Sequence, residues 1–248
     1  MRANIEMSFN NELTVPIDYN YILHEMILNC MGKEGYETLI HDKRYEYKNR
    51  SYKLFTFSKL FGKFEMDKEN STITYFDRAN FTVSSPDYTF LNYLINRVLK
   101  NPNFKIGWND IKIKKIENSH AQLGSSEVIY TKSPIVAYKT LDNDKRRKTL
   151  YYSPYEDEFQ EILKENLVNK YKAIYGFKPE RNDFKINILD TKKPKSSSIN
   201  YQGHIIKGWN GEFLLEGSQE LLQIAYDTGL GLKNSQGFGC IEVKEIIG

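Results

Sequence analysis

The sequence has few cysteines and no long apolar run, and each shortage excludes a class of protein. Only Cys30 and Cys240 occur among the 248 residues, too few for a disulfide framework or a cysteine-rich zinc site. The apolar runs fall far short of the ~18 to 20 residues that span a bilayer, and the N-terminal segment lacks the apolar core of a signal peptide. We therefore expect an intracellular, cytoplasmic protein that does not enter a membrane.

An excess of one charge is also missing. The chain has 35 basic and 32 acidic residues, a formal net charge of +3 with neutral histidines. So small an excess does not by itself indicate a nucleic-acid partner, and only the distribution of charge along the chain could do so. The length fits one large domain or two small domains, each able to bury a core.

Basic residues gather in three stretches, 41–63, 145–148 and 192–195. The first holds seven lysines and arginines against two acidic residues, interleaved with tyrosine and phenylalanine. This mixture suits single-stranded or looped RNA, because cations neutralise phosphates while ring faces stack on bases. For any one stretch a solvated surface is the alternative, but three stretches in one chain favour RNA.

The first half of the chain predicts the order strand, helix, strands, helix, strand. Alternating apolar residues indicate a strand at 4–9, and apolar residues spaced by three and four indicate a helix at 19–31 that Gly32 stops. Ser85 is expected to cap the second helix, with Pro86 at its first position. The other elements expected here are a short segment at 37–41, strands at 53–57, 64–66 and 71–76, a turn at 69–70, a helix end at 101–102 and a strand at 104–115.

The second half repeats this order. Ser153 and Glu156 form a predicted capping box for a helix that runs to about Tyr175, and Ser218 starts the last helix. The expected strands are residues 128–138, 149–152, 184–189, 203–215 and 238–246. Each half therefore fits a β-α-β-β-α-β plan, so we expect an α+β fold of two tandem ferredoxin-like domains, residues 1–123 and 124–248.

Four glycines lie within eleven residues near the C-terminus: Gly229, Gly231, Gly237 and Gly239. This segment follows a predicted helix and precedes a strand, the reverse of a dinucleotide-binding fingerprint. Such a segment can adopt positive φ angles and expose backbone NH groups to phosphate oxygens, with residues 233–236 as added donors. The alternative is a helix cap at Gly229 followed by a bulged turn.

Residues 229–243, GLGLKNSQGFGCIEV, resemble the C-terminal signature of the Cas six family, the CRISPR repeat-RNA endoribonucleases of the repeat-associated mysterious protein superfamily. The resemblance spans nearly the whole chain. Its weakest parts are residues 139–149 and 190–202, which look like variable loops. Three other landmarks agree in order: Val15-Pro16 with Tyr19-Asn20, His41 before the stretch Lys53-Leu-Phe-Thr-Phe-Ser58, and Ser133-Pro134-Ile135-Val136.

The resemblance implies tandem ferredoxin-like domains that cut CRISPR precursor transcripts within each repeat, without metal or cofactor. The 2′-OH attacks the adjacent phosphate and leaves a 2′,3′-cyclic phosphate and a 5′-OH. That reaction needs a base, an acid and positive charge on the phosphorane. The resemblance places His41 at the family histidine, whose pKa suits proton transfer near neutral pH, and Lys53 at the family lysine beside the scissile phosphate.

The chain departs from the family at one catalytic position. Leu28 stands where members with a tyrosine, histidine and lysine set carry the tyrosine late in the first helix. We choose Tyr47 as the second acid–base group. Tyr36, or His41 acting alone, are the alternatives.

The resemblance also assigns RNA-binding residues and partners. The expected partners are CRISPR repeat RNA, a type I interference complex and a second copy of the chain. A catalytically inactive RNA-binding member of the same superfamily is the alternative, and a Mg²⁺-dependent nuclease is poorly supported because the sequence has no tight carboxylate cluster. The expected RNA-binding residues are Lys233, Asn234, Ser235, Gln236, Gly237, Phe238 and Gly239 in the glycine-rich segment, Arg44, Lys48 and Arg50 in the basic stretch, and Arg146, Arg147, Lys193 and Lys195 in variable loops.

Overall fold

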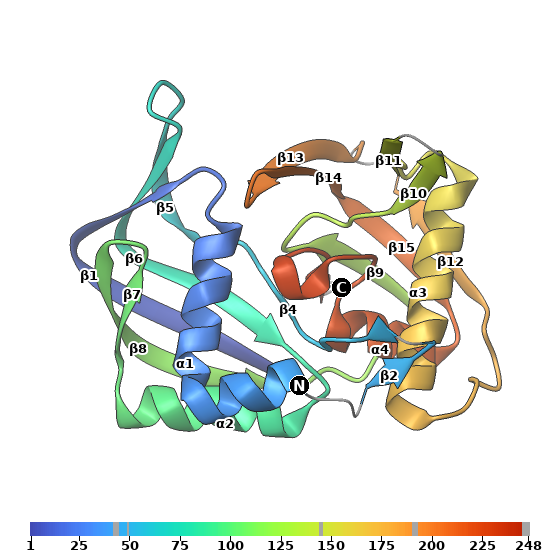
Figure 1. Cartoon of the computed structure of the whole chain (residues 1–248), viewed down its shortest axis with the longest axis horizontal. Coiled ribbons are helices and arrows are strands. Elements are labelled where there is room, and N and C mark those ends of the chain that lie inside the picture. The colour runs from blue at the N-terminus through green and yellow to red at the C-terminus, as the bar shows by residue number, and fades with distance from the viewer. Residues whose placement is uncertain (42–44, 49, 144–145, 190–192, 245–248) are drawn as a thin grey trace.

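The part of the chain that the structure describes forms two main antiparallel sheets, each with a pair of helices (Figure 1). The structure is a computed structural model that describes residues 1–41, 45–48, 50–143, 146–189 and 193–244. The side chains of residues 33–41, 50, 142–143 and 146–147 lie outside that description.

The first sheet has the strand order β4-β6-β1-β8-β7, and β5 also pairs with β6. Along β1, Ala3, Ile5 and Met7 are buried and alternate with more exposed residues, because successive side chains of a strand point to opposite faces. Two helices, α1 (Asn20–His41) and α2 (Tyr88–Lys100), contribute to the same core. The strands are β1 (Arg2–Pro16), β4 (Thr56–Phe57), β5 (Phe61–Asp67), β6 (Thr72–Ser84), β7 (Asn103–Ile106) and β8 (Asn109–Ser119).

The second sheet has the order β12-β15-β9-β16. Its core includes Phe159, Leu163 and Leu167 from α3, which pack with Phe213 and Leu215 from β15. The elements are β9 (Ser126–Thr131), α3 (Asp157–Tyr175), β12 (Phe184–Ile188), β15 (Glu212–Gly217), α4 (Gln219–Thr228) and β16 (Ile241–Val243).

The two sheets share one topology. In each, the first strand of the β-α-β-β-α-β order lies between the third and the fourth, and the second lies at the edge beside the third. Every described strand pairing within these two sheets is antiparallel. The prediction of two tandem ferredoxin-like units is confirmed, whereas the boundary between residues 123 and 124 stays a prediction.

Three short hairpins and a 3₁₀ turn are added to this plan. The first hairpin lies between α1 and β4, the second between β9 and α3, and the third between β12 and β15. Parts of the second and third hairpins lie at 139–149 and 190–202, the stretches expected to be variable loops, so the structure has strands where loops were expected. The last strand of the third hairpin lies within the strand expected at 203–215. These elements are β2 (Glu46–Tyr47) and β3 (Arg50–Ser51), β10 (Tyr138–Asn143) and β11 (Arg146–Tyr151), β13 (Lys195–Tyr201) and β14 (His204–Asn210), and η1 (Asn234–Gln236).

The helix ends in the first half differ from expectation at two places. Gly32, with φ 67° and ψ 177°, interrupts α1 as predicted, but the helix resumes and reaches His41, so residues 37–41 are not a separate segment. The cap of α2 is Asp87, not Ser85, because the Asp87 carboxylate accepts bonds from the NH groups of Thr89 and Phe90.

The helix ends in the second half are closer to expectation. α3 ends at Tyr175 as predicted, and Ser218 caps α4 by accepting from the Leu221 NH. The Glu156 carboxylate accepts from both the NH and the hydroxyl of Ser153, at 2.6 and 2.7 Å, so the return contact of the capping box forms. The helix itself begins later, at Asp157.

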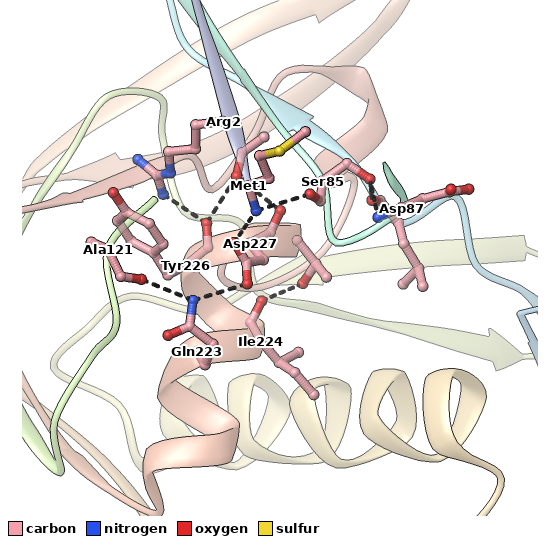
Figure 2. Close-up of polar contacts among 12 residues, drawn as sticks. Met1, Arg2, Ser85, Asp87, Ala121, Gln223, Ile224, Tyr226 and Asp227 are labelled. Atoms are coloured by element: carbon pink, nitrogen blue, oxygen red, sulfur yellow. Dashed lines mark hydrogen bonds and ion pairs between the residues drawn. The ribbon is translucent and has the colours of Figure 1, made fainter. Parts of the chain in front are cut away.

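Arg2 joins the two sheets (Figure 2). Its fully buried guanidinium, at the start of β1, donates to the Tyr226 carbonyl of α4 at 2.6 Å and lies 3.3 Å from the centroid of the Tyr226 ring. It also pairs with the Glu242 carboxylate of β16 at 3.0 Å. A buried charge with all these partners fixes β1 of the first sheet against α4 and β16 of the second.

Candidate nucleic-acid interface

His41 is the last residue of α1. The kink at Gly32 redirects the chain, so His41 belongs to a second helical segment. Its backbone is therefore held by a helix rather than by a loop. Its side chain lies outside the described residues, as do the whole of Arg44 and the side chain of Tyr36.

Lys53 lies in the connection between β3 and β4, and its side chain is exposed. The strand expected at 53–57 is shorter than predicted, because only Thr56 and Phe57 pair with β6. Burial, together with the positive charge of nearby Lys53, lowers the pKa of His24 on α1 to about 4. Lys53 is thus an exposed cation beside the first turns of α1.

Tyr47, on β2, contacts α3 of the second half. The Lys172 ammonium donates to the Tyr47 hydroxyl at 3.2 Å and lies 4.9 Å from the ring centroid, and the Lys48 ammonium lies 5.7 Å from it. The hydrogen bond from Lys172 lowers the pKa of Tyr47, with the charges of Lys48 and Lys178 adding to the effect. Tyr47 therefore lies beside α3, whereas Lys53 lies beside the first turns of α1.

The glycine-rich segment is largely internal. Asn234, Gly237, Phe238 and Gly239 are buried. The NH of Gly237 donates to the Asn234 carbonyl and that of Gly239 to the Pro134 carbonyl. The expectation that this segment exposes its backbone NH groups is therefore wrong at these two positions. Lys233, Ser235 and Gln236 are partly exposed.

All four glycines of the segment are required by close packing as well as by positive φ angles. A Cβ at Gly237 would lie 2.5 Å from the Phe57 ring, and one at Gly239 would lie 2.0 Å from the Leu230 carbonyl oxygen. A Cβ at Gly229 would lie 2.7 Å from the Asn234 amide nitrogen. These contacts explain the glycine spacing by the fold itself.

Lys170 of α3 hydrogen-bonds the glycine-rich segment. Its ammonium is buried and donates to the Gly229 carbonyl and the Asn234 side-chain oxygen, both at 2.7 Å. The Asn234 amide in turn donates to the Phe238 carbonyl at 3.0 Å. The sequence does not predict this role for Lys170, because a lysine on a helix is ordinarily exposed.

The same segment packs on α1 and β4 of the first half. The Asn20 amide donates to the carbonyls of Gln236 and Gly237, at 3.2 and 3.1 Å, and the Thr56 hydroxyl donates to the Phe238 carbonyl at 2.9 Å. The glycine-rich segment therefore lies at the junction of the two halves, between α1 and α3.

The third hairpin also reaches α1 (Figure 1). The hydroxyl of Tyr201, at the end of β13, hydrogen-bonds His24 Nδ1 at 2.6 Å, and the ring of Tyr21 meets the Tyr201 ring edge-on. The other ring nitrogen of His24, Nε2, is buried without a partner among the described residues. Tyr201 and His24 were not predicted as a pair, because they are far apart in the sequence.

The remaining predicted cations are distributed over the hairpins. Lys48, Lys193 and Lys195 are exposed. Arg50 is on β3 and Arg146 and Arg147 are on β11, and the side chains of all three lie outside the described residues.

The described residues contain neither a metal-binding cluster nor a membrane-spanning helix. No group of three or more His, Cys, Asp or Glu side chains is placed to hold a metal ion in the part of the chain that the structure describes. No helix built from described residues is long and apolar enough to cross a membrane.

Comparison with known protein families gives matches in both halves. The family described as "CRISPR associated protein Cas6, C-terminal" matches residues 110–243, and the family "CRISPR-associated protein Cas6, N-terminal" matches residues 14–117. The first match alone covers more than half of the chain.

Individual proteins agree with these matches. The chain is 25% identical to "CRISPR-associated endoribonuclease Cas6 1" of Methanocaldococcus jannaschii over 97% of this chain and 92% of that protein. It is 27% identical to "Putative CRISPR-associated endoribonuclease-like protein Cas6nc" of Pyrococcus horikoshii, over 93% and 94%. Among solved structures, one described as a "Cas6-related gene from Pyrococcus furiosus" has a TM-score of 0.86 at 24% identity, covering 99% of each chain.

Proposed function

Since the chain belongs to the Cas6 family of CRISPR-associated proteins, we propose that it is an endoribonuclease that cleaves CRISPR precursor transcripts within the repeat. The observation that carries this proposal is the family match across both halves of the chain. An endoribonuclease name on a relative that aligns over nearly the full length of both chains supports the same conclusion.

We propose metal-independent chemistry, in which the ribose 2′-OH displaces the 5′-oxygen of the next nucleotide. His41 takes the proton from the 2′-OH, and Lys53 places positive charge on the phosphorane. Tyr47 gives a proton to the leaving oxygen. The lowered pKa of Tyr47 supports that role, because a more acidic phenol gives up its proton more readily.

Measuring RNA binding and RNA cleavage separately tests these roles. His41→Ala should bind repeat RNA as the natural chain does but cleave it at least about 100-fold more slowly, the usual contribution of a general acid or base. A single 2′-deoxy nucleotide just 5′ of the cut should abolish cleavage by the natural chain. Undiminished cleavage in either experiment contradicts the mechanism.

The RNA path is proposed to cross the exposed cations Lys48, Lys193 and Lys195 and the partly exposed Lys233. We keep Ser235 and Gln236 as direct RNA contacts because they are partly exposed, and we assign Asn234, Gly237, Phe238 and Gly239 to shaping the segment, because they are buried. The RNA contacts of four arginines stay predictions: Arg44, Arg50, Arg146 and Arg147.

A catalytically inactive RNA-binding protein is the second candidate. Leu28, at the family tyrosine position, is only 6% exposed and belongs to the first core, so this position offers no polar group to a substrate. The relative from P. horikoshii is named only endoribonuclease-like. Tight binding of repeat RNA without product, at any pH and with or without metal ions, would favour this candidate.

The partners proposed beside repeat RNA are a type I interference complex and a second copy of the chain. For the second copy, the exposed strand β5 supplies a surface. Each of its seven residues is exposed, including Phe61, Phe64 and Met66, and its one described pairing is with β6. Pairing two copies antiparallel about Phe64 would set Lys63 of each opposite Glu65 of the other.

Sedimentation or light scattering tests this dimer. We expect a dimeric mass for the natural chain and a monomeric mass for Phe64→Lys, because the substitution places like charges at the centre of the pairing. A monomeric natural chain at high protein concentration contradicts the proposal for β5.

A further inference from the structure

A cavity of about 540 Å³ lies between the second and third hairpins, outside the residues assigned to catalysis. Its floor is one face of the β10–β11 hairpin. Tyr138 pairs with Tyr151 and Thr140 pairs with Thr149, and residues two apart on a strand share a face. His204, Ile205 and Ile206 of β14 form a wall, and Lys233 also lines the cavity. We call this space the tyrosine–threonine pocket.

The aromatic floor is held in place. The rings of Tyr138 and Tyr151 lie 5.7 Å apart between centroids, tilted by 50°. The Tyr151 hydroxyl donates to the Ile205 carbonyl at 3.1 Å, which ties the floor to the wall. Both tyrosines are only partly buried, so their rings remain accessible from the cavity.

The charge around the pocket favours an anion. None of the described side chains that line it is acidic, and the Lys233 ammonium lies 5.6 Å from the centroid of the Tyr138 ring. Lys233 has a left-handed backbone, with φ 59°, and immediately precedes η1. The neighbouring Asn234 side chain is buried and hydrogen-bonded, so the backbone position from which the Lys233 side chain extends is fixed.

The end of the third hairpin links the pocket to α1. His204 pairs across the hairpin with Tyr201, and Tyr201 bonds His24, whose pKa responds to Lys53. The volume lies within the range of ordinary ligand sites, about 300–1,000 Å³.

We propose that the tyrosine–threonine pocket binds one unpaired base of the repeat RNA, a role that rests on the proposed function. The base stacks on the tyrosine pair, the hydroxyls of Thr140 and Thr149 hydrogen-bond its edge, and Lys233 pairs with its phosphate. Aromatic rings beside a cation are the usual recognition chemistry for an unpaired base.

Binding of fluorescent repeat RNA in EDTA, with the His41→Ala chain to prevent cleavage, tests the pocket. Adding Tyr138→Ala should weaken binding about tenfold, a loss within the range that one base stack contributes, while Tyr138→Phe should bind within about twofold of the parent. Tyr88→Ala, which removes an exposed tyrosine on α2, should have no effect. Thr140→Trp, which fills the pocket without removing a floor tyrosine, should weaken binding as Tyr138→Ala does.

A scan with single abasic nucleotides locates the base. One position in the repeat should weaken binding to the parent about tenfold, with little further loss when Tyr138 is already alanine. If RNA binds but Tyr138→Ala and Thr140→Trp bind as tightly as the parent, the pocket is overturned and the proposed function stands. If repeat RNA does not bind at all, both fail.

Discussion

His24 shows how one residue can depend on both halves of the chain. Burial and the Lys53 charge lower the pKa of its imidazole to about 4, and its Nδ1 bonds Tyr201 of the third hairpin. The ring is therefore neutral at neutral pH, where it links α1 to the second half. It acts as a structural contact and not as a proton carrier near pH 7.

The lowered pKa of His24 predicts a specific loss of stability in mild acid. An unfolded histidine takes up its proton near pH 6.5, whereas folded His24 does so only near pH 4. The stabilisation is thus complete above pH 6.5 and is lost as the pH falls from 6.5 towards 4. Between pH 7.5 and 5.0 the free energy of unfolding should drop about 2 kcal/mol more in the natural chain than in His24→Phe. Urea unfolding at the two pH values measures this, and equal drops in the two proteins contradict it.

At the scale of elements, the helices and core strands follow from local pattern. On α3, Phe159 and Leu163 have the four-residue spacing of one helix face, and both are buried. The hairpin strand β13 was missed because only Ile199 and Tyr201 among its seven residues are buried, too few for a visible alternation. The Asp87 cap was missed because Ser85 and Asp87 both suit a helix start, and only the three-dimensional turn selects between them.

The glycine-rich segment yields a prediction about packing. Gly237 and Gly176 both have left-handed backbones, with φ 86° and 81°. A Cβ at Gly237 would collide with Phe57, whereas nothing lies within 4 Å of a Cβ at Gly176. We expect Gly237→Ala to lower the free energy of unfolding by about 1 to 3 kcal/mol more than Gly176→Ala, since only the first adds a steric clash to the backbone strain. Denaturant unfolding of the two variants measures the difference, and equal losses would show that the segment does not need close packing on β4.

For the whole molecule, the junction between the two halves determines the geometry of the proposed site. Arg2, Asn20 and His24 of the first half each bond the second half. None of these contacts could be predicted from sequence, because each joins residues more than 170 positions apart. The positions of His41 and Lys53 came from family resemblance, whereas the internal role of the glycine-rich segment emerged only from the fold.

Arg2 gives the strongest test of the junction. Arg2→Met should lower the free energy of unfolding by about 3 kcal/mol, because it leaves Glu242 and the Tyr226 carbonyl without their buried partner. Arg78→Met is the matched control: its exposed guanidinium is 3.7 Å from Glu6, and its loss should cost less than about 1 kcal/mol. Thermal and urea unfolding measure the free energy of unfolding of the two variants. Similar small losses would mean that the junction does not depend on Arg2.

The chemistry of the RNA ends tests the central claim most directly. Repeat RNA should be incubated with the natural chain in excess EDTA and the product ends identified by mass spectrometry. The account predicts one cut in the repeat, with a 2′,3′-cyclic phosphate on the upstream product and a 5′-OH on the downstream one. A strict need for Mg²⁺, or a 5′-phosphate on the downstream product, would contradict it.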